Sequence, residues 1–214
     1  AKGGVDRGFL SDLTRQLALE QRRGNEVILV SSGAIRAGRD LLCRTTESTP
    51  VLPDTLPFKQ AAAAIGQGQL IHAYTEAFAW RDVNCAQILL TREDLSDRRR
   101  FLNARNTLLA LLSLGVVPVI NENDTVAVDE IKFGDNDNLA ALVATLVSAD
   151  LLLILSDVAG LYPYSPEAGR PEPPIIPQVE KVDASIVALA GGTQSSSGTG
   201  GMRTKVEAAR IATE

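Results

Sequence analysis

The sequence alternates short apolar runs with longer helical stretches, and this order constrains the fold more than any other feature. Each run is a few residues long, rich in Val, Ile and Leu, and apolar at successive positions, as in a strand buried on both faces. The runs are residues 26–31, 83–90, 116–121 and 151–156. Strands of this kind, linked by helices, form parallel sheets covered on both sides. The sequence therefore predicts an α/β protein, a three-layer α/β/α sandwich around a mainly parallel sheet.

Helices are expected between these strands, and loops where Pro, Gly, Ser and Thr gather. A short extended excursion is expected at 126–131, and a proline-rich surface segment at 163–178. No internal repeat or clear boundary divides the chain, so we expect one domain over residues 1–214. The predicted helices are residues 9–23, 34–42, 58–80, 98–114, 138–148, 183–190 and a final helix from about Met202.

Composition argues against several classes of function. A formal net charge of −5 is unfavourable for nucleic-acid binding, which needs a basic face, and no apolar window is long enough to span a membrane. His72 is the one histidine, which argues against a histidine triad or a multi-histidine metal site. Cys43 and Cys85 are expected to be free thiols in a reducing cytoplasm. The remaining side chains, mainly Lys, Arg, Asp, Asn, Ser and Thr, are those that phosphoryl transfer requires.

Small polar residues follow three of the four predicted strands, where ligands bind in open parallel sheets. They are SSGA at 31–34, NEND at 121–124, and Ser156 with Asp157. A fourth cluster, GDNDNL at 134–139, opens a helix and joins the others only if the excursion before it folds back. Turns alone account for any one cluster, and a helix start needs one capping residue where GDNDNL offers several. Four clusters in one chain favour contact with a ligand.

The segment SSGTGGMRTK at 196–205 is a candidate phosphate loop. Glycines leave backbone N–H groups free to face an anion, and a following helix directs its positive end there. Arg203 and Lys205 would add positive charge. The spacing fits neither the Walker A motif nor the dinucleotide fingerprint, so a flexible linker is as consistent with this pattern alone.

Taken together, these motifs resemble the amino acid kinase family, and within it the group that phosphorylates glutamate for proline biosynthesis. The resemblance covers nearly the whole chain in family order. FLNARNT together with NEND and GDNDNL distinguishes this group from the branches that act on aspartate, acetylglutamate, carbamate or uridylate. The matching stretches are SSGAIRAGR at 31–39, LTREDLSDRRRFLNARNT at 90–107, PVINENDTVA at 118–127, IKFGDNDNLAA at 131–141, LSDVAGLY at 155–162 and GTGGMRTK at 198–205.

The resemblance implies transfer of the γ-phosphoryl group of ATP to the side-chain carboxylate of L-glutamate, with Mg²⁺ and no metal ligand from the protein. It implies that Ser32, Asp124 and Asn136 bind glutamate. Lys205 would stabilise charge on the transferring phosphoryl group, and Asp137 would orient the catalytic lysines. A carboxylate nucleophile is already ionised at pH 7, so this chemistry needs no general base.

The resemblance also implies an ATP site and a set of partners. Ser156 and Asp157 would contact ATP near its base and ribose. Family members are commonly dimers or tetramers and take proline as a feedback inhibitor, so we expect a homo-oligomer. The residues implied for the phosphates are Thr199, Gly200, Gly201, Met202, Arg203, Thr204 and Lys205.

The chain departs from the family pattern at both ends. The family begins with a strand that carries a lysine and a small phosphate loop, and its kinase domain continues with further strands. We therefore expect residues 1–214 to lack the first strand and the C-terminal strands. Three other interpretations stay open: an acetylglutamate kinase-like enzyme, the kinase half of a bifunctional pyrroline-5-carboxylate synthase, and a non-catalytic module that binds glutamate or proline. Lys205 and Asp137 argue against the last.

Overall fold

A computed structural model describes residues 5–45, 53–127, 136–164, 173–190 and 201–214. These residues form two compact units, Ala1–Ile131 and Lys132–Glu214, and each unit is described by itself. The predicted excursion at 126–131 and the loop at 191–201 lie mostly outside the described residues.

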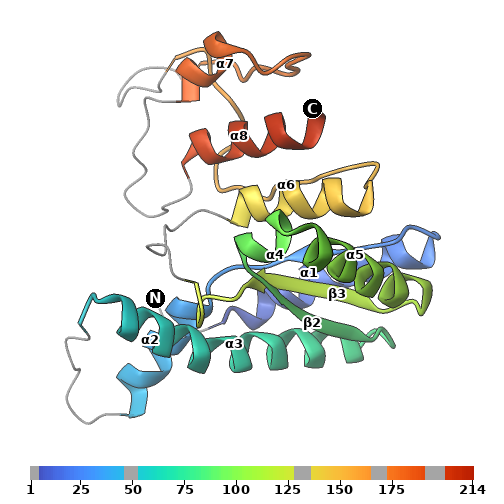
Figure 1. Cartoon of the computed structure of the whole chain (residues 1–214), viewed down its shortest axis with the longest axis vertical. Helices are drawn as coiled ribbons and strands as arrows, with labels where there is room; N and C mark the ends of the chain where they lie inside the picture. Colours follow the sequence, from blue (N-terminus) through green and yellow to red (C-terminus); the bar gives the residue numbers. More distant parts are fainter. Residues whose placement is uncertain (1–4, 46–52, 128–135, 165–172, 191–200) are drawn as a thin grey trace. The chain divides into compact units, whose positions relative to one another are not determined.

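The first unit is built on a parallel sheet, as predicted (Figure 1). Its strands are β1 (Leu29–Val30), β2 (Cys85–Leu90) and β3 (Val117–Glu122), in the order β1-β3-β2. Leu29 pairs with Val119, and Gln87 pairs with Val119 from the other side. The helices of this unit are α1 (Arg7–Arg22), α2 (Ala34–Thr45), α3 (Leu56–Ala79), α4 (Arg92–Ser96) and α5 (Arg98–Ser113).

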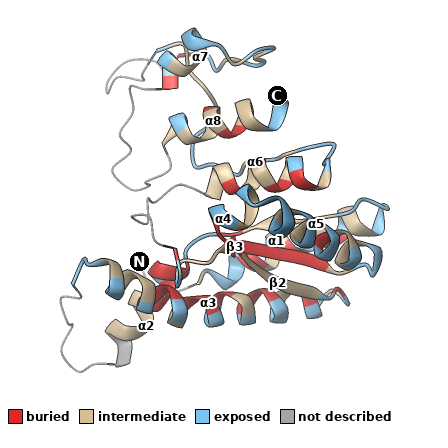
Figure 2. Ribbon diagram, viewed as in Figure 1, coloured by how far each residue is buried: buried red, intermediate tan, exposed pale blue. Residues whose placement is uncertain are grey.

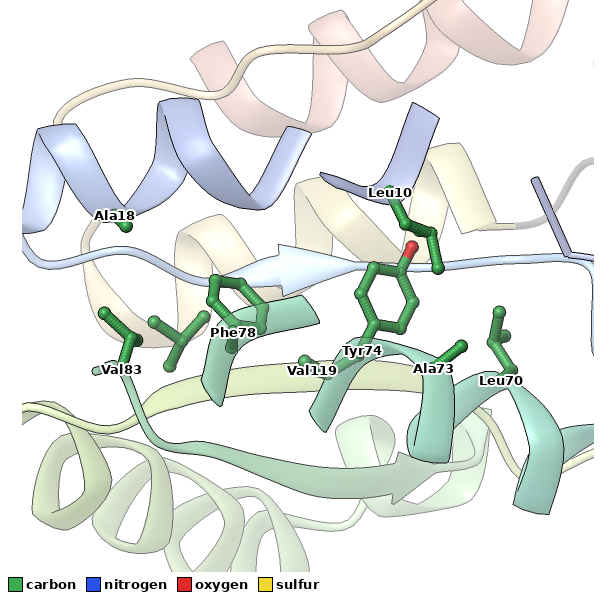
Figure 3. Packing of buried hydrophobic residues seen from close by; sticks show 9 residues of the cluster. Leu10, Ala18, Leu70, Ala73, Tyr74, Phe78, Val83 and Val119 are labelled. Atoms are coloured by element: carbon green, nitrogen blue, oxygen red, sulfur yellow. The ribbon is translucent and has the colours of Figure 1, made fainter. Parts of the chain in front are cut away.

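The core of this unit lies between the sheet and two helices, α1 and α3 (Figure 3). Successive side chains of a strand point to opposite faces. Val117 and Val119 therefore share one face and pack into the cluster with Phe78 and Tyr74 of α3. The cluster of buried residues is Leu10, Ala18, Leu70, Ala73, Tyr74, Phe78, Val83, Val117 and Val119.

Side-chain caps determine where several of these helices begin. The carboxylate of Asp6 accepts from the backbone N–H of Phe9 at 3.0 Å and starts α1. Asp97 caps α5 in the same way. Thr91 and Asp94 form a capping box at α4, a helix that we did not predict. Such caps satisfy backbone donors that have no partner within the helix.

Helices α2 and α3 approach each other very closely at two glycines. A Cβ atom on Gly38 would lie 1.8 Å from the carbonyl oxygen of Ala62, and one on Gly66 would lie 1.8 Å from that of Ala34. No side chain fits at either position, because real Cβ contacts are never shorter than about 3 Å. The glycines therefore fix the crossing of α2 over α3.

The second unit contains helices α6 (Asn136–Val147), α7 (Ala184–Leu189) and α8 (Met202–Thr213). Helix α6 packs on α8, and both helices contain buried residues (Figure 2). The buried residues of α6 are Leu139, Ala141, Val143 and Leu146, and those of α8 are Val206 and Ala208. The helices expected at 138–148, at 183–190 and from Met202 are confirmed.

The prediction of a strand at 151–156 is wrong for the described structure. These residues form no strand, and alternate side chains face solvent: Leu151, Leu153 and Leu155 are 78 %, 74 % and 57 % exposed. A strand needs a neighbour that completes its ladder of backbone hydrogen bonds. The described part of this unit contains helices and irregular segments, so the apolar run has no strand to pair with.

Candidate functional site

The carboxyl ends of β1 and β3 lie at the same edge of the parallel sheet. After β1, the backbone N–H of Ser31 donates to the carbonyl of Ile120 at 2.8 Å and extends the pairing by one residue. Gly33 has a φ of +96°, which favours glycine, and α2 begins at the next residue. Ser32 is exposed at this turn, where the first predicted glutamate contact was placed. A helix N-terminus attracts negative charge, and that of α2 begins two residues after Ser32.

Asp124 lies in the loop that follows β3. The loop is anchored where the backbone N–H of Asn123 donates to the carbonyl of Leu90 at 2.8 Å. Burial raises the pKa of the Asp124 carboxyl from 3.8 to about 6. No hydrogen bond or ion pair from residues with described positions compensates this carboxylate. Asp124 is therefore suited to bind a cationic group.

A pocket of about 200 Å³ opens beside Ser32 in the first unit. Gly33, Arg36 and the ring of Tyr74 form part of its wall. Asp124 does not line the pocket, so the structure places Ser32 and Asp124 at one sheet edge without enclosing them in one cavity.

Two buried polar side chains of α3 also reach this edge, and neither was among the predicted site residues. Gln67 is 9 % exposed and Tyr74 is 5 % exposed. The side chain of Asn121 donates to Oε1 of Gln67 at 2.8 Å, and the hydroxyl of Ser31 donates to Oη of Tyr74 at 3.1 Å. Burial raises the pKa of the Tyr74 phenol. The available signal was the seven-residue spacing of these polar residues within an apolar helix face.

In the second unit, a compact polar cluster joins the first turns of α6 and α8. The Nζ atom of Lys205 lies 3.0 Å from Oδ2 of Asp137, and both side chains are largely buried, with 19 % and 18 % exposed. The hydroxyl of Thr204 donates to the same carboxylate oxygen at 2.8 Å. The structure therefore brings together three of the residues that the resemblance singled out.

The N-terminus of α8 carries the described part of the predicted phosphate loop. Gly201 is the N-cap residue and supplies no side-chain cap, although its carbonyl accepts from the backbone N–H of Thr204 at 3.1 Å. Met202 and Arg203 form the first turn of the helix. Thr199 and Gly200 lie outside the described residues.

The remaining predicted residues occupy two places in the second unit. Asn136 is the first residue of α6, next to Asp137, so both residues are inside the helix, which we predicted to begin only at residue 138. Ser156 and Asp157 lie in an exposed turn, where the backbone N–H of Val158 donates to Oγ of Ser156 at 3.3 Å. Within the described part of the chain, no hydrogen bond links this turn to Asp137 or Lys205.

A magnesium ion held by the protein alone would need several oxygen ligands placed close together. Among the described residues, no group of three or more His, Cys, Asp or Glu is placed to hold a metal ion. One oxygen of Asp137 is already engaged by Lys205 and Thr204.

In the described part of the chain no helix is both long enough and apolar enough to cross a membrane. Cys43 and Cys85 are free thiols, as expected.

Comparison with known proteins assigns the chain to a family. The model of the amino acid kinase family matches residues 2–214. The chain belongs to the amino acid kinase family. Membership confirms the predicted fold class, and the parallel sheet with flanking helices agrees with it.

This amino acid kinase chain is similar over almost its whole length to three curated bacterial proteins named glutamate 5-kinase. The protein of Geobacter sp. (strain M21) is 56 % identical over 208 residues, which is 97 % of this chain and 54 % of that protein. The protein of Dehalococcoides mccartyi (strain CBDB1) is 50 % identical over 214 residues, 99 % of this chain and 56 % of that protein. The protein of Shewanella oneidensis (strain ATCC 700550 / JCM 31522 / CIP 106686 / LMG 19005 / NCIMB 14063 / MR-1) is 51 % identical over 208 residues, 97 % of this chain and 54 % of that protein. The chain thus spans about half the length of the curated relatives it matches.

Proposed function

We propose that this protein transfers the γ-phosphoryl group of ATP to the γ-carboxylate of L-glutamate, giving L-glutamyl 5-phosphate and ADP. The observation that carries the proposal is the cluster of Lys205, Asp137 and Thr204, which joins the first turns of α6 and α8. The names of relatives 50–56 % identical to this chain support the choice of substrate.

The cluster suits the phosphoryl side of the reaction. Negative charge spreads over the phosphoryl oxygens during transfer, so catalysis depends on positioning and on neutralising that charge. Lys205 supplies a cation, and its salt bridge to Asp137 limits the directions in which the amine can point. The N-terminal N–H groups of α8 and the side chain of Arg203 would hold the phosphates of ATP, which arrives as its magnesium complex. Ser156 and Asp157 would contact its base and ribose.

The sheet edge of the first unit suits the glutamate side. Asp124, with its burial and its lack of a partner among described residues, would bind the α-ammonium group of glutamate. Ser32 would donate a hydrogen bond from the exposed turn before α2. The resemblance to the family adds Asn136, the first residue of α6, as a further glutamate contact. The γ-carboxylate oxygen then attacks phosphorus as the bond to the bridging oxygen of ADP breaks.

The alternative activities are less well supported. An acetylglutamate kinase-like enzyme has no primary ammonium group on its substrate for Asp124 to bind. A regulatory module would not need the Lys205–Asp137 pair. We further propose a cytoplasmic homo-oligomer with proline as feedback inhibitor; inhibition by proline and sedimentation of the purified protein test these two points.

The decisive experiment measures ADP release with four acceptors: glutamate, N-acetylglutamate, aspartate and uridylate. The proposal expects turnover with L-glutamate and background rates with the other three. Comparable turnover on any of the others would overturn the assignment.

A further inference from the structure

Helix α3 carries a line of three polar side chains at seven-residue spacing: Gln60, Gln67 and Tyr74. Residues seven apart lie two turns apart on the same side of a helix, about 10.5 Å along its axis. This side of α3 faces the sheet edge, and its neighbouring positions are apolar, including Ala63, Leu70 and others of the core. The three polar residues interrupt a surface that would otherwise pack as an ordinary apolar core.

Each member of this line makes a hydrogen bond to a residue at the sheet edge or in the loop that follows β3. Gln60 Nε2 donates to the carbonyl of Ala127 at 3.1 Å. Gln67 Oε1 accepts from Nδ2 of Asn121 at 2.8 Å. The phenol oxygen of Tyr74, which lies beside Leu10 in Figure 3, accepts from Ser31 at 3.1 Å.

Two of these bonds hold the chain on either side of Asp124. Asn121 is near the end of β3 and Ala127 lies in the loop that follows, and Asp124 is three residues from each. The side chain of Asn121 is held at both of its polar atoms, because its Oδ1 also accepts the backbone N–H of Glu122 at 2.9 Å. The third bond holds Ser31, the residue directly before Ser32.

We infer that Gln60, Gln67 and Tyr74 are positioning residues for the glutamate site, and that α3 fixes the separation of Ser32 from Asp124. This inference rests on the proposed function. Gln67 and Tyr74 are buried, whereas Gln60 is partly exposed. Buried polar groups cost free energy unless they are hydrogen-bonded, and apolar residues would fill the positions of Gln67 and Tyr74 at lower cost. Their partners at the sheet edge account for polar residues here, because a buried network specifies one arrangement of the loops it joins.

The test compares matched variants of the protein. Tyr74→Phe removes the phenol oxygen alone, and Gln67→Met keeps the shape of the side chain but cannot accept from Asn121. Gln67→Glu restores an acceptor oxygen at the same distance along the chain. Thr14→Val is the control, because Thr14 is fully buried and its hydroxyl bonds the carbonyls of Leu10 and Ala77.

Two kinds of measurement are made on each variant. The first gives the KM and Kd for glutamate, and the second gives the rate of hydrogen exchange at residues 32–34 and 123–127. Loss of one buried hydrogen bond should raise the KM and Kd for glutamate about 5- to 10-fold in Tyr74→Phe and Gln67→Met. The KM for ATP should stay unchanged, and Gln67→Glu should recover most of the glutamate affinity. Thr14→Val should lower stability without changing either glutamate constant.

The outcomes separate this inference from the proposed function. If Tyr74→Phe and Gln67→Met lower stability as Thr14→Val does and leave glutamate binding and loop exchange unchanged, the positioning role is wrong. If the unmodified protein binds no glutamate while both variants still speed exchange in the two loops, the proposed function fails and α3 keeps its role in placing the loops. Should Gln67→Met not fold, Tyr74→Phe decides the question alone.

Discussion

The amine of Lys205 lies 3.0 Å from Oδ2 of Asp137, and the hydroxyl of Thr204 donates to that same oxygen at 2.8 Å. Asp137 is in the first turn of α6 and the other two residues are in the first turn of α8, so the packing of these helices brings the three together. A lysine held by one carboxylate oxygen keeps its direction while its charge stays available to a nearby anion. The cluster therefore places a cation at the N-terminus of α8.

We expect Lys205→Ala to act on the chemical step. If Lys205 neutralises charge that develops during transfer, its loss should lower kcat about 10²- to 10³-fold, with a smaller change in the KM for glutamate. Steady-state kinetics measure both constants, and circular dichroism checks the fold. Arg210→Ala is the matched control, because Arg210 is on the same helix and pairs with Glu207 and Glu214. A wild-type kcat in Lys205→Ala would mean that the segment at 196–205 is only a linker.

The fold of the first unit could be predicted largely from its sequence, because local signals and packing agree there. The run at 116–121 is apolar on both faces and becomes β3, paired on both sides. The run at 151–156 has the same pattern, yet it forms no strand, since hydrogen-bond partners come from other parts of a chain and not from the run itself. The pattern indicates burial and an extended backbone but cannot supply the neighbour.

The candidate site was predictable only where motifs carried it. The glycine-rich segment at 196–205 and its positive charges indicated Lys205, and the surplus of polar residues in GDNDNL at 134–139 indicated Asp137. Gln67 and Tyr74 were missed because they stand within an alanine-rich helix, where a polar residue is ordinary on the exposed face. Their importance depends on which face of α3 is buried, and this follows from tertiary packing.

The pKa of Asp124 predicts how glutamate binding depends on pH. A carboxylate binds an ammonium group only when ionised, and the pKa of Asp124 in the free protein is about 6. The KM for glutamate should therefore be constant above pH 7 and rise about tenfold per pH unit well below pH 6. Kinetics from pH 5 to 8.5 measure this, with the KM for ATP as control. A glutamate KM that is flat across this range would contradict the role of Asp124.

The same carboxyl should cost stability when it is ionised. Its pKa is raised above 3.8 in the folded state, so its contribution to stability is present below about pH 4 and is lost as pH rises through about 6. The full shift corresponds to about 3 kcal/mol, and solvent screening at this partly exposed side chain reduces it to roughly 1 kcal/mol. Asp124→Asn should therefore raise Tm by about 2–4 °C at pH 7.5 and by nothing at pH 4. Calorimetry at both pH values measures the difference, and an equal shift at both would show that ionisation is not its cause.

Asn136→Ala should weaken the binding of glutamate before the chemical step. A hydrogen bond from a side-chain amide to a charged ligand is worth about 1.5–3 kcal/mol, so the KM for glutamate should rise about 10- to 100-fold. The KM for ATP should stay nearly unchanged, and kcat should fall less than in Lys205→Ala. Gln178→Ala, in an exposed segment of the same unit, is the control. If Asn136→Ala raises the KM for ATP alone, the glutamate site and the ATP site have been assigned the wrong way round.

Gly66 and Gly68 of α3 form a matched pair for testing the crossing of α2 over α3. A Cβ atom on Gly66 would lie 1.8 Å from the carbonyl oxygen of Ala34, so Gly66→Ala must separate the helices and should cost about 1–3 kcal/mol or more of unfolding free energy. A Cβ atom on the exposed Gly68 meets nothing within 4 Å, and Gly68→Ala should stabilise by about 0.5–1 kcal/mol because alanine favours the helix.

Urea unfolding measures both changes, and glutamate binding gives the functional consequence. Gly66 directly precedes Gln67, and Ala34 directly follows the turn of Ser32 and Gly33. Separation of the two helices should therefore weaken glutamate binding in Gly66→Ala and leave it unchanged in Gly68→Ala. Equal effects of the two substitutions on stability would mean that helix propensity, and not the close approach of α2, decides what these glycines do. A destabilised Gly66→Ala with normal glutamate affinity would mean that the crossing supports the fold without positioning the site.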